Sequence, residues 1–540
     1  MELAGLVLSA VALFDSCLKG YQLVSDIKGL GQDSAILLCR LQIEEKRLTI
    51  WGRTVGLAEE TCRLPADELD TILTVLKEIK SITQEAAELK KRYGASSDSD
   101  RGSSDEVVEY IQSSAVLLDL RRRIDAKAQS SRPSWKAGLR FMFDRKNFEK
   151  LVVDLRELNN GLYALLQAPQ RMSSMHDFSE VCLLSSASDD ARKLATIRDA
   201  SQSTYDTLSR TVDQRLHLLH LQDYSPEVLK GSSKCIPLKK LSMVETRTTG
   251  NRSIALLNDE ATLIEWRAYT DDENNHEVVG ILEERIAGLS VLLGQTPKPK
   301  EFQVLDCVGY CHDELEKRFG IIYNLPTLDP DFIPEIVSLY DLIHPSTGAE
   351  KIFPSLNDRF QLSNTLANSL LQLHSTKWLH RNLRSSHILF LKTGKNMVWF
   401  HEPYICGFEY SRPDDINAIS LPLRPGEVEV EYQHPDLAEY PRVGYCREYD
   451  AYSLGIILAE IGFWRPIADF RKPTYTPKRN HRRLLEYQLS GDLAHRMGVR
   501  YEQAVKLLLT EKAYEGVTEG EQLVAFLDNV VTKVDLRCLA

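Results

Sequence analysis

The apolar residues of the first 222 positions recur every three or four residues, which is the spacing of helices with one buried side. No stretch of alternating apolar and polar residues, the pattern of a strand, interrupts them. The pattern therefore predicts an all-α helical bundle over residues 1–222, whose last helix covers residues 189–221. The defining positions are Leu37, Leu41, Leu48, Trp51, Leu69, Ile72, Leu76, Ile79, Phe148, Leu151, Leu155, Leu162, Leu194, Ile197, Leu208, Val212 and Leu216.

Residues 3–14 differ from the other helices because they are apolar on every helical face apart from Ser9. The run is shorter than the ~20 apolar residues of a spanning helix, and it starts with Glu2 rather than with the positive charge of a secretory signal. Two interpretations remain: a helix buried in the bundle, which the residues alone favour, or a helix that also inserts into a membrane. The residues that would then enter the membrane are Leu3, Leu6, Val7, Val11 and Phe14.

The pattern changes after residues 223–240, which are rich in polar and turn-forming residues and predict a linker. Residues 261–269 and 319–326 are short apolar runs that predict buried strands. Residues 359–373 have the spacing of an amphipathic helix. We therefore expect a second domain over residues 241–540 in which helices and strands are mixed.

Two stretches of the second domain carry candidate chemistry. Residues 378–390 read Trp-Leu-His-Arg-Asn-Leu-Arg-Ser-Ser-His-Ile-Leu-Phe, and residues 405–412 read Ile-Cys-Gly-Phe-Glu-Tyr-Ser-Arg. The first resembles the catalytic loop of a protein kinase, His-Arg-Asp-Leu-x-x-x-Asn, in which His380 and Arg381 keep the pattern. The second stands where the Asp-Phe-Gly turn of a kinase follows.

Three residues depart from the kinase pattern at positions that carry its chemistry. Asn382 replaces the catalytic aspartate, His387 replaces a metal-binding asparagine, and Gly407 replaces the main magnesium ligand. An amide cannot act as a general base. Glycine offers no side-chain oxygen to Mg²⁺, and imidazole suits softer metals. No catalytic residue is intact, so the resemblance predicts a pseudokinase that transfers phosphate negligibly and holds no metal.

The resemblance extends from about residue 236 to the C-terminus and implies a bilobal α+β fold. Its structural landmarks are Phe408 in the turn, Pro435 and Asp436 in an Ala-Pro-Glu-like segment, and Asp450, which resembles the aspartate that ties a buried helix to the catalytic loop. Arg267 occupies the place of the ATP-pairing lysine, and no Gly-x-Gly-x-x-Gly precedes it. Any ATP binding is therefore expected to be weak and indifferent to magnesium.

A second resemblance concerns the N-terminal half. The start Met-Glu-Leu-Ala-Gly-Leu-Val-Leu and residues 143–159, Phe-Asp-Arg-Lys-Asn-Phe-Glu-Lys-Leu-Val-Val-Asp-Leu-Arg-Glu-Leu-Asn, are similar to the HeLo domain of filamentous fungi. HeLo proteins of the prion-inhibition and propagation family include membrane-permeabilising effectors of regulated cell death and heterokaryon incompatibility. The resemblance covers residues 1–222 and makes membrane insertion of residues 3–14 the favoured interpretation. The order of domains resembles the mixed-lineage kinase domain-like pseudokinases.

Composition narrows the choice of partners. The net charge of −11 argues against nucleic acid, because phosphate binding needs a basic face. Ten cysteines scattered through a long chain are typical of cytosolic thiols rather than of a disulfide framework. We therefore expect a cytoplasmic protein that is recruited conditionally to the plasma membrane.

Three functions remain open at this point. The favoured one is a switch in which the pseudokinase senses an upstream signalling protein or receptor and releases a membrane-active bundle, which forms homo-oligomers on activation. The second is a divergent, ATP-binding kinase with unusual metal ligands such as Glu409 or Asp414. The third is a non-enzymatic scaffold with two binding domains.

Overall fold

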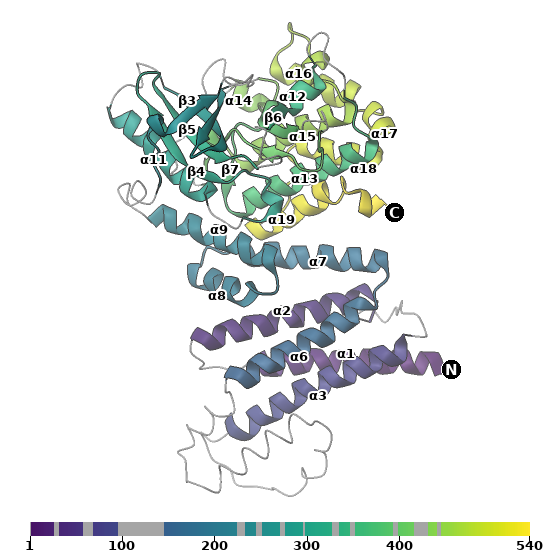
Figure 1. Ribbon diagram of the computed structural model, residues 1–540. Coiled ribbons are helices and arrows are strands. Elements are labelled where there is room, and N and C mark those ends of the chain that lie inside the picture. Colours follow the sequence, from purple (N-terminus) through teal and green to yellow (C-terminus); the bar gives the residue numbers. More distant parts are fainter. Residues whose placement is uncertain are drawn as a thin grey trace, which may run out of the picture. The chain divides into compact units, whose positions relative to one another are not determined.

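By their contacts the residues divide into two compact units, Met1–Phe178 and Ser179–Ala540, each treated by itself below (Figure 1). The predicted domain boundary at residues 223–240 stays a prediction. The computed structural model describes residues 2–25, 32–57, 68–94, 145–223, 233–244, 251–269, 276–294, 298–326, 334–345, 352–392, 398–414, 430–439 and 444–539.

The first unit is helical throughout its described residues, as the sequence predicts. α1 packs on α2 and α3, and α6 packs on the same two helices. Their inward residues form one apolar core that includes Leu41, Leu48, Trp51, Ile72 and Leu155. The helices are α1 (Glu2–Ser25), α2 (Gln32–Thr54), α3 (Leu69–Gly94), α6 (Arg145–Ala164) and the first part of α7 (Ala168–Ser186).

α1 enters this core through a single stripe. Ala10, Phe14, Cys17 and Tyr21 are each at most 2% exposed and follow one another at steps of three or four residues. Gly52 of α2 leaves room for the Phe14 ring, because a Cβ at Gly52 would overlap that ring. The stripe therefore packs α1 against α2 and α3, and half-buried apolar residues beside it also contact the core.

A buried carboxylate joins α2 to α6. Glu44 is 1% exposed and accepts a hydrogen bond from Asn159 Nδ2 at 3.0 Å. It also pairs with Arg47 at 3.0 Å and with Arg156 at 3.4 Å. Sliding α6 along α2 would leave this charge buried without partners, so the cluster specifies the register of the two helices.

The second unit begins with a five-stranded antiparallel sheet in the order β1-β2-β3-β5-β4. The β2–β3 hairpin turns at Asn258 and Asp259, both with positive φ, and its register places Arg252 opposite Glu265. α11 (His276–Leu293) packs against β4 and β5. The strands are β1 (Leu241–Val244), β2 (Arg252–Leu257), β3 (Glu260–Ala268), β4 (Cys307–Asp313) and β5 (Arg318–Asn324), of which β3 and β5 match the two predicted strands.

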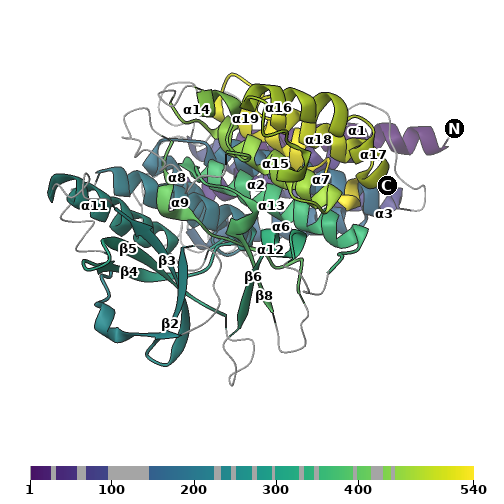
Figure 2. The same ribbon diagram turned by 90° about the horizontal axis from the view of Figure 1, so that it is seen from above.

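Helices and two small sheets make up the rest of this unit. Figure 2 shows strands β2 to β5 and α11 on one side, with α13, α15 and α18 on the other. α15 is buried on all sides from Tyr449 to Phe463. β7 pairs with β10, and β8 pairs with both β6 and β9. The second unit is thus a mixture of helices and antiparallel sheet.

The elements of this region follow in chain order. The strands are β6 (Glu335–Ser338), β7 (Trp378–Leu379), β8 (Ile388–Lys392), β9 (Tyr404–Ile405) and β10 (Arg412–Pro413). The helices are α12 (Leu339–Ile343), α13 (Leu356–Ser375), α14 (Pro435–Glu439), α15 (Arg447–Phe463), α16 (Pro477–Arg483), α17 (Asp492–Met497), α18 (Val499–Leu509) and α19 (Glu519–Phe526).

The prediction of one helix over residues 189–221 is wrong. The chain forms α8 (Ala191–Ser201) and α9 (Asp206–Asp223), which fold back on each other. The break falls in a polar Ser-Gln-Ser-Thr-Tyr stretch, where the Ser201 hydroxyl donates to the Ile197 carbonyl at 2.7 Å. Folding back lets the apolar residues of each helix bury the other's, which a single straight helix could not do. By their contacts both helices belong with the C-terminal unit.

We predict that Gly52→Ala destabilises the first unit by about 1–3 kcal/mol, because the added methyl group forces the Phe14 ring to move. Urea unfolding of the full chain, together with deuterium exchange of the α1 amides, measures the effect. Gly161→Ala is the matched control: it lies near the end of α6 with no atom within 4 Å of its Cβ. It should stabilise the helix by up to ~1 kcal/mol. Equal effects of the two changes would contradict the close approach.

Candidate functional site

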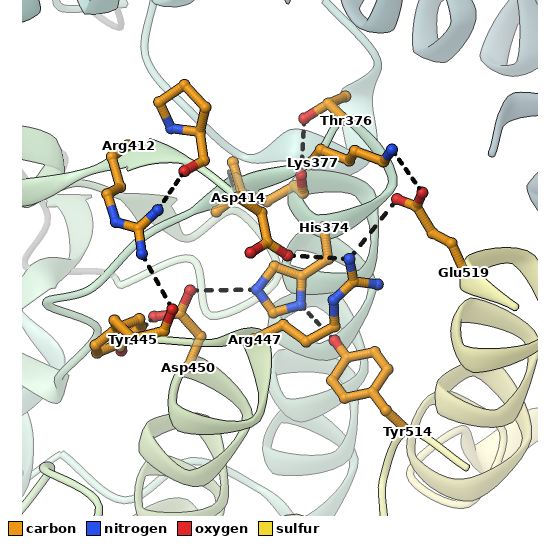
Figure 3. A network of polar contacts seen from close by, with 12 residues as sticks. His374, Thr376, Lys377, Arg412, Asp414, Tyr445, Arg447, Asp450, Tyr514 and Glu519 are labelled. Carbon is orange, nitrogen blue, oxygen red and sulfur yellow. Dashed lines mark hydrogen bonds and ion pairs between the residues drawn. The ribbon is translucent and has the colours of Figure 1, made fainter. Parts of the chain in front are cut away.

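The loop after β7 is held by the carboxylate of Asp450, which is 0% exposed at the start of α15. It accepts hydrogen bonds from the backbone nitrogens of His380 at 2.7 Å and Arg381 at 2.8 Å. The Tyr445 hydroxyl donates to it at 2.7 Å, and His374 Nε2 lies at 3.2 Å, as Figure 3 shows for His374. Burial would raise the pKa of Asp450, but the hydrogen bond and charge of His374, with His380 and Tyr445, hold it below its ordinary value.

These bonds fix a strained backbone. Arg381 has φ +68°, in the left-handed region that side chains other than glycine rarely adopt. His380 anchors the other side of the loop: its Nε2 lies 3.0 Å from the Cys406 carbonyl, and its ring is 4.6 Å from that of Phe408. Phe408 is 1% exposed. His380, Arg381, Phe408 and Asp450 therefore form one packed support for the loop.

Asn382 faces a carboxylate rather than open space. Its Nδ2 donates to Glu409 Oε1 at 2.9 Å, and the residue is 7% exposed. Burial raises the pKa of Glu409, and the charge of Glu265 raises it further. The Asn382 amide thus donates to Glu409, and an amide cannot itself act as a general base.

The His387 ring fills the space next to Gly407. Gly407 has φ +88°, and a Cβ placed on it would overlap the ring of His387. An aspartate at position 407 would therefore need both a different backbone and the removal of His387. The two positions that the kinase resemblance makes metal anchors are thus packed against each other, and a side chain at position 407 would meet the His387 ring.

Both nitrogens of His387 are already used. Nδ1 donates to the Asn382 carbonyl at 2.7 Å, and Nε2 accepts from Arg384 Nη2 at 3.0 Å. Burial lowers the pKa of His387 well below its ordinary value, and the charges of Arg384 and Arg252 lower it further. The ring is held neutral in one tautomer, with no lone pair directed at a metal.

Arg267, the predicted partner of ATP phosphates, stacks on Tyr410 just after the Gly407 turn and does not line the cavity next to that turn. Its residue is 2% exposed, and its guanidinium lies 3.7 Å from the centre of the Tyr410 ring. The residue of β3 that reaches the Gly407 turn is Glu265, which accepts the Gly407 N–H at 2.9 Å. Glu265 also pairs with Arg252 at 3.0 Å.

Sequence reasoning missed this buried Arg252–Glu265 pair. A signal was present, because charged residues in two consecutive apolar strands need partners inside the sheet. A cavity of about 340 Å³ adjoins the pair. Its lining combines both signs of charge and does not include Arg267. The lining residues are Asn251, Arg252, Glu265, Trp266, Ser338, Tyr340, Asp341, Arg384, Ser386, His387 and Glu409.

The two carboxylates considered as unusual metal ligands both have partners. Glu409 accepts from Asn382, as described, and Asp414 pairs with Arg447 at 3.0 Å. Of the other landmarks, Pro435 is buried at the start of α14. Asp436 pairs with Lys478 at 3.1 Å.

The predicted membrane-entering residues lie on α1 and differ in exposure. The side chain of Leu3 lies outside those the structure describes. Leu6, Val7 and Val11 are half-buried, and Phe14 is 2% exposed. Leu8 and Leu23 are the outward apolar residues, at 66% and 52% exposed.

One helix among the described residues is long and apolar enough to cross a membrane. It covers Gly5–Val24, 20 residues, of which 33% are buried in the structure. This stretch is longer than the predicted run at residues 3–14, because Leu18, Tyr21, Leu23 and Val24 continue it past Asp15. Length and composition alone do not distinguish a spanning helix from a core helix.

Two family models match the chain. Residues 3–197 match HeLo, described as prion-inhibition and propagation, and residues 316–511 match a domain of unknown function (DUF7580). No curated protein matches. The first match supports a fungal HeLo-domain protein. The HeLo domain is associated with cell death and incompatibility. The second assigns neither a fold nor an activity.

We predict that ATP raises the melting temperature little, and equally with and without Mg²⁺, because the metal positions are occupied by His387 and its contacts. A ligand present at 100 times its Kd would stabilise the native state by about 2.7 kcal/mol. Thermal-shift titration of the full chain measures this. A large shift that requires Mg²⁺ and disappears in Glu409→Ala would support the divergent kinase instead.

Buried histidines should make stability depend on pH. Burial lowers the pKa of His380, His387 and His434, and lowers that of His481 to about 4. In the unfolded chain histidine titrates near 6.5. As pH falls below that value, the unfolded state binds protons that the native state cannot, so stability is lost.

The free energy of unfolding should therefore decrease from pH 7.5 to pH 5.5. The decrease is up to about 1.4 kcal/mol per pH unit for each proton that the unfolded state binds and the native state does not. Glu409 opposes the trend, because its raised pKa favours protonation of the native state. Urea titrations at each pH measure the slope, and His481→Gln should reduce it. A stability that is constant or increases toward pH 5.5 would contradict the assignment.

Proposed function

We propose that this chain is a signal-controlled effector of cell death or incompatibility, in which a pseudokinase domain regulates a membrane-permeabilising HeLo-like bundle. The observation that carries the proposal is α1, whose residues Gly5–Val24 have the length and composition of a spanning helix while only 33% of them are buried. The match of residues 3–197 to HeLo supports the same class of function.

α1 is only partly committed to the bundle. Its buried stripe combines the small residues Ala10 and Cys17 with two large side chains, Phe14 against Gly52 and the fully buried Tyr21, and release would have to withdraw both. Leu8 and Leu23 already face outward. Asp15 and Lys19 would oppose deep insertion of a single helix, so a homo-oligomer that shelters these charges is the expected active form.

The pseudokinase assignment is supported by the order of elements. An antiparallel sheet with a packed helix precedes α13, the loop at residues 380–387, the turn at 407–409 and the buried helix α15, which is the order that the kinase resemblance implies. The contacts of Asn382, His387 and Gly407 oppose phosphoryl transfer. Such a domain acts by binding and changing shape, with at most weak ATP binding.

The expected partners follow from this role. An upstream signalling protein or receptor would act on the C-terminal unit in the cytoplasm, and the membrane would be the conditional target of the bundle. The net charge of −11 makes nucleic acid an unsuitable partner. The bundle would bind anionic lipid through the apolar surface of α1 rather than through its net charge.

We predict that residues 1–222 release dye from anionic liposomes and that Leu8→Lys reduces release at least tenfold. Leu8 is 66% exposed, so the change should leave the folded bundle intact. A lysine at the centre of a spanning helix costs about 2.5–3.5 kcal/mol on insertion scales and less near its end. Leu8 lies three residues after the start of Gly5–Val24, and a tenfold loss requires only about 1.4 kcal/mol. Dye release and circular dichroism are measured on the same samples.

Val153→Lys is the matched control, because Val153 is a 46% exposed apolar residue of the same bundle on α6. It should leave release unchanged. If the folded 1–222 fragment neither binds liposomes nor releases dye, α1 is only a core helix and the scaffold function is favoured. If both lysine variants lose release equally, the effect is one of surface charge and not of α1.

A further inference from the structure

The helix pair α8–α9 is docked within the C-terminal unit, where Figure 1 shows α9 running below α19. Leu183, at the end of α7, and Leu218 of α9 belong to the main apolar core of that unit. Two polar contacts extend the docking: Arg210 donates to the Lys298 carbonyl at 3.0 Å, and Thr211 donates to Gln372 at 3.0 Å. The docking of α8–α9 thus combines apolar packing with polar contacts.

A charge network occupies the other part of the same contact. Asp189, directly before α8, accepts from Lys377 Nζ at 2.6 and 2.7 Å and pairs with Arg215 of α9. Glu519, at the start of α19, lies 2.9 Å from Lys377 and 4.0 Å from Arg215. Both cations thus share both carboxylates.

Of the four charged residues in this network, Arg215 depends most on its ionic partners. Its side chain is 0% exposed, whereas that of Asp189 is 63% exposed. Among the described residues its Nε and Nη1 have no hydrogen-bond partner, so Asp189 reaches it through Nη2 alone. Burial lowers the pKa of Arg215, and the charges of Glu519 and Asp189 offset this only in part. A buried guanidinium that loses its carboxylate is strongly destabilising.

The same charges connect to the loop at residues 380–387. Lys377 has φ +55° in the turn that leads into β7, and its carbonyl accepts the Asp414 N–H at 2.8 Å. Arg447, one turn before Asp450 on α15, pairs with Asp414 at 3.0 Å and lies 3.7 Å from Glu519. Figure 3 shows Lys377, Glu519, Arg447 and Asp414 side by side next to His374 and Asp450.

We propose that Asp189, Arg215, Lys377 and Glu519 form an ionic latch that keeps α8–α9 docked only while the buried charge of Arg215 is matched. Withdrawal of a carboxylate, for example when a partner displaces the start of α19 and with it Glu519, leaves the charge of Arg215 insufficiently matched and releases the helix pair. The latch itself is independent of the membrane function proposed above. Its consequence, release of the N-terminal bundle, rests on that function.

Hydrogen–deuterium exchange of the full chain tests the latch. Asp189→Asn should make the amides of α8 and α9 exchange at least tenfold faster, while those of α15 stay protected. Asp469→Asn is the matched control, because Asp469 pairs with Arg465 at 3.2 Å on the surface of the same unit, with side chains 42% and 58% exposed. That change should leave the exchange rates of the α8 and α9 amides equal to those of the unaltered chain.

A second variant separates charge from packing. Adding Arg215→Met to Asp189→Asn removes the unmatched charge but keeps a long apolar side chain, so protection of α8 and α9 should return to within about threefold of the unaltered chain. Normal protection in Asp189→Asn would overturn the latch and leave the apolar packing, with the Arg210 and Thr211 hydrogen bonds, as the basis of docking. Failure of Arg215→Met to restore protection would equally overturn it.

Dye release by the full chain is measured separately. Faster exchange in Asp189→Asn accompanied by increased release supports both the latch and the membrane effector. Faster exchange without release supports the latch and argues against its role in controlling the bundle. Because exchange is measured without lipid, the latch can be confirmed or overturned even if the proposed membrane function fails.

Discussion

The buried carboxylate of Asp450 is the contact on which the C-terminal unit depends. It joins the end of α13, through His374, to the backbone of His380 and Arg381 and to Tyr445. With 0% exposure it requires all of these donors, and in turn it holds Arg381 in a left-handed conformation. Arg447 lies on the same helix, so the network that includes α8–α9 is built on the same rigid support.

This support holds a loop in which Asn382, His387 and Gly407 contact one another, rather than one that only lacks metal ligands. The His387 ring lies where a side chain at position 407 would be, and the Asn382 carbonyl and Arg384 fix that ring as a neutral tautomer. Glu265 takes the Gly407 N–H and the Arg252 guanidinium together. Each replacement therefore accommodates another, which is why a single reverse substitution would meet a clash or an unmatched charge.

In the N-terminal bundle, α1 is only partly buried. α1 commits one stripe to the core, with Phe14 seated against Gly52, and leaves Leu8 and Leu23 in water. Exposed apolar side chains on an otherwise amphipathic bundle gain nothing from the folded state. The membrane-bound state proposed above would bury that surface, and Asp15 and Lys19 would limit how a single copy could enter it.

The sequence alone predicted that the N-terminal residues are helical and that the C-terminal residues mix helices and strands, because local periodicity decides which side of a helix or strand is apolar. It therefore identified β3, β5, α13 and the positions Asn382, His387 and Gly407. Which partner meets each side depends on contacts between distant segments. Only the tertiary structure showed that Glu265, not Arg267, reaches the Gly407 turn, since the packing of β3 against the loop selects between two residues on one face. Likewise, the break between α8 and α9 and the burial of Arg215 follow from docking, which no local pattern encodes.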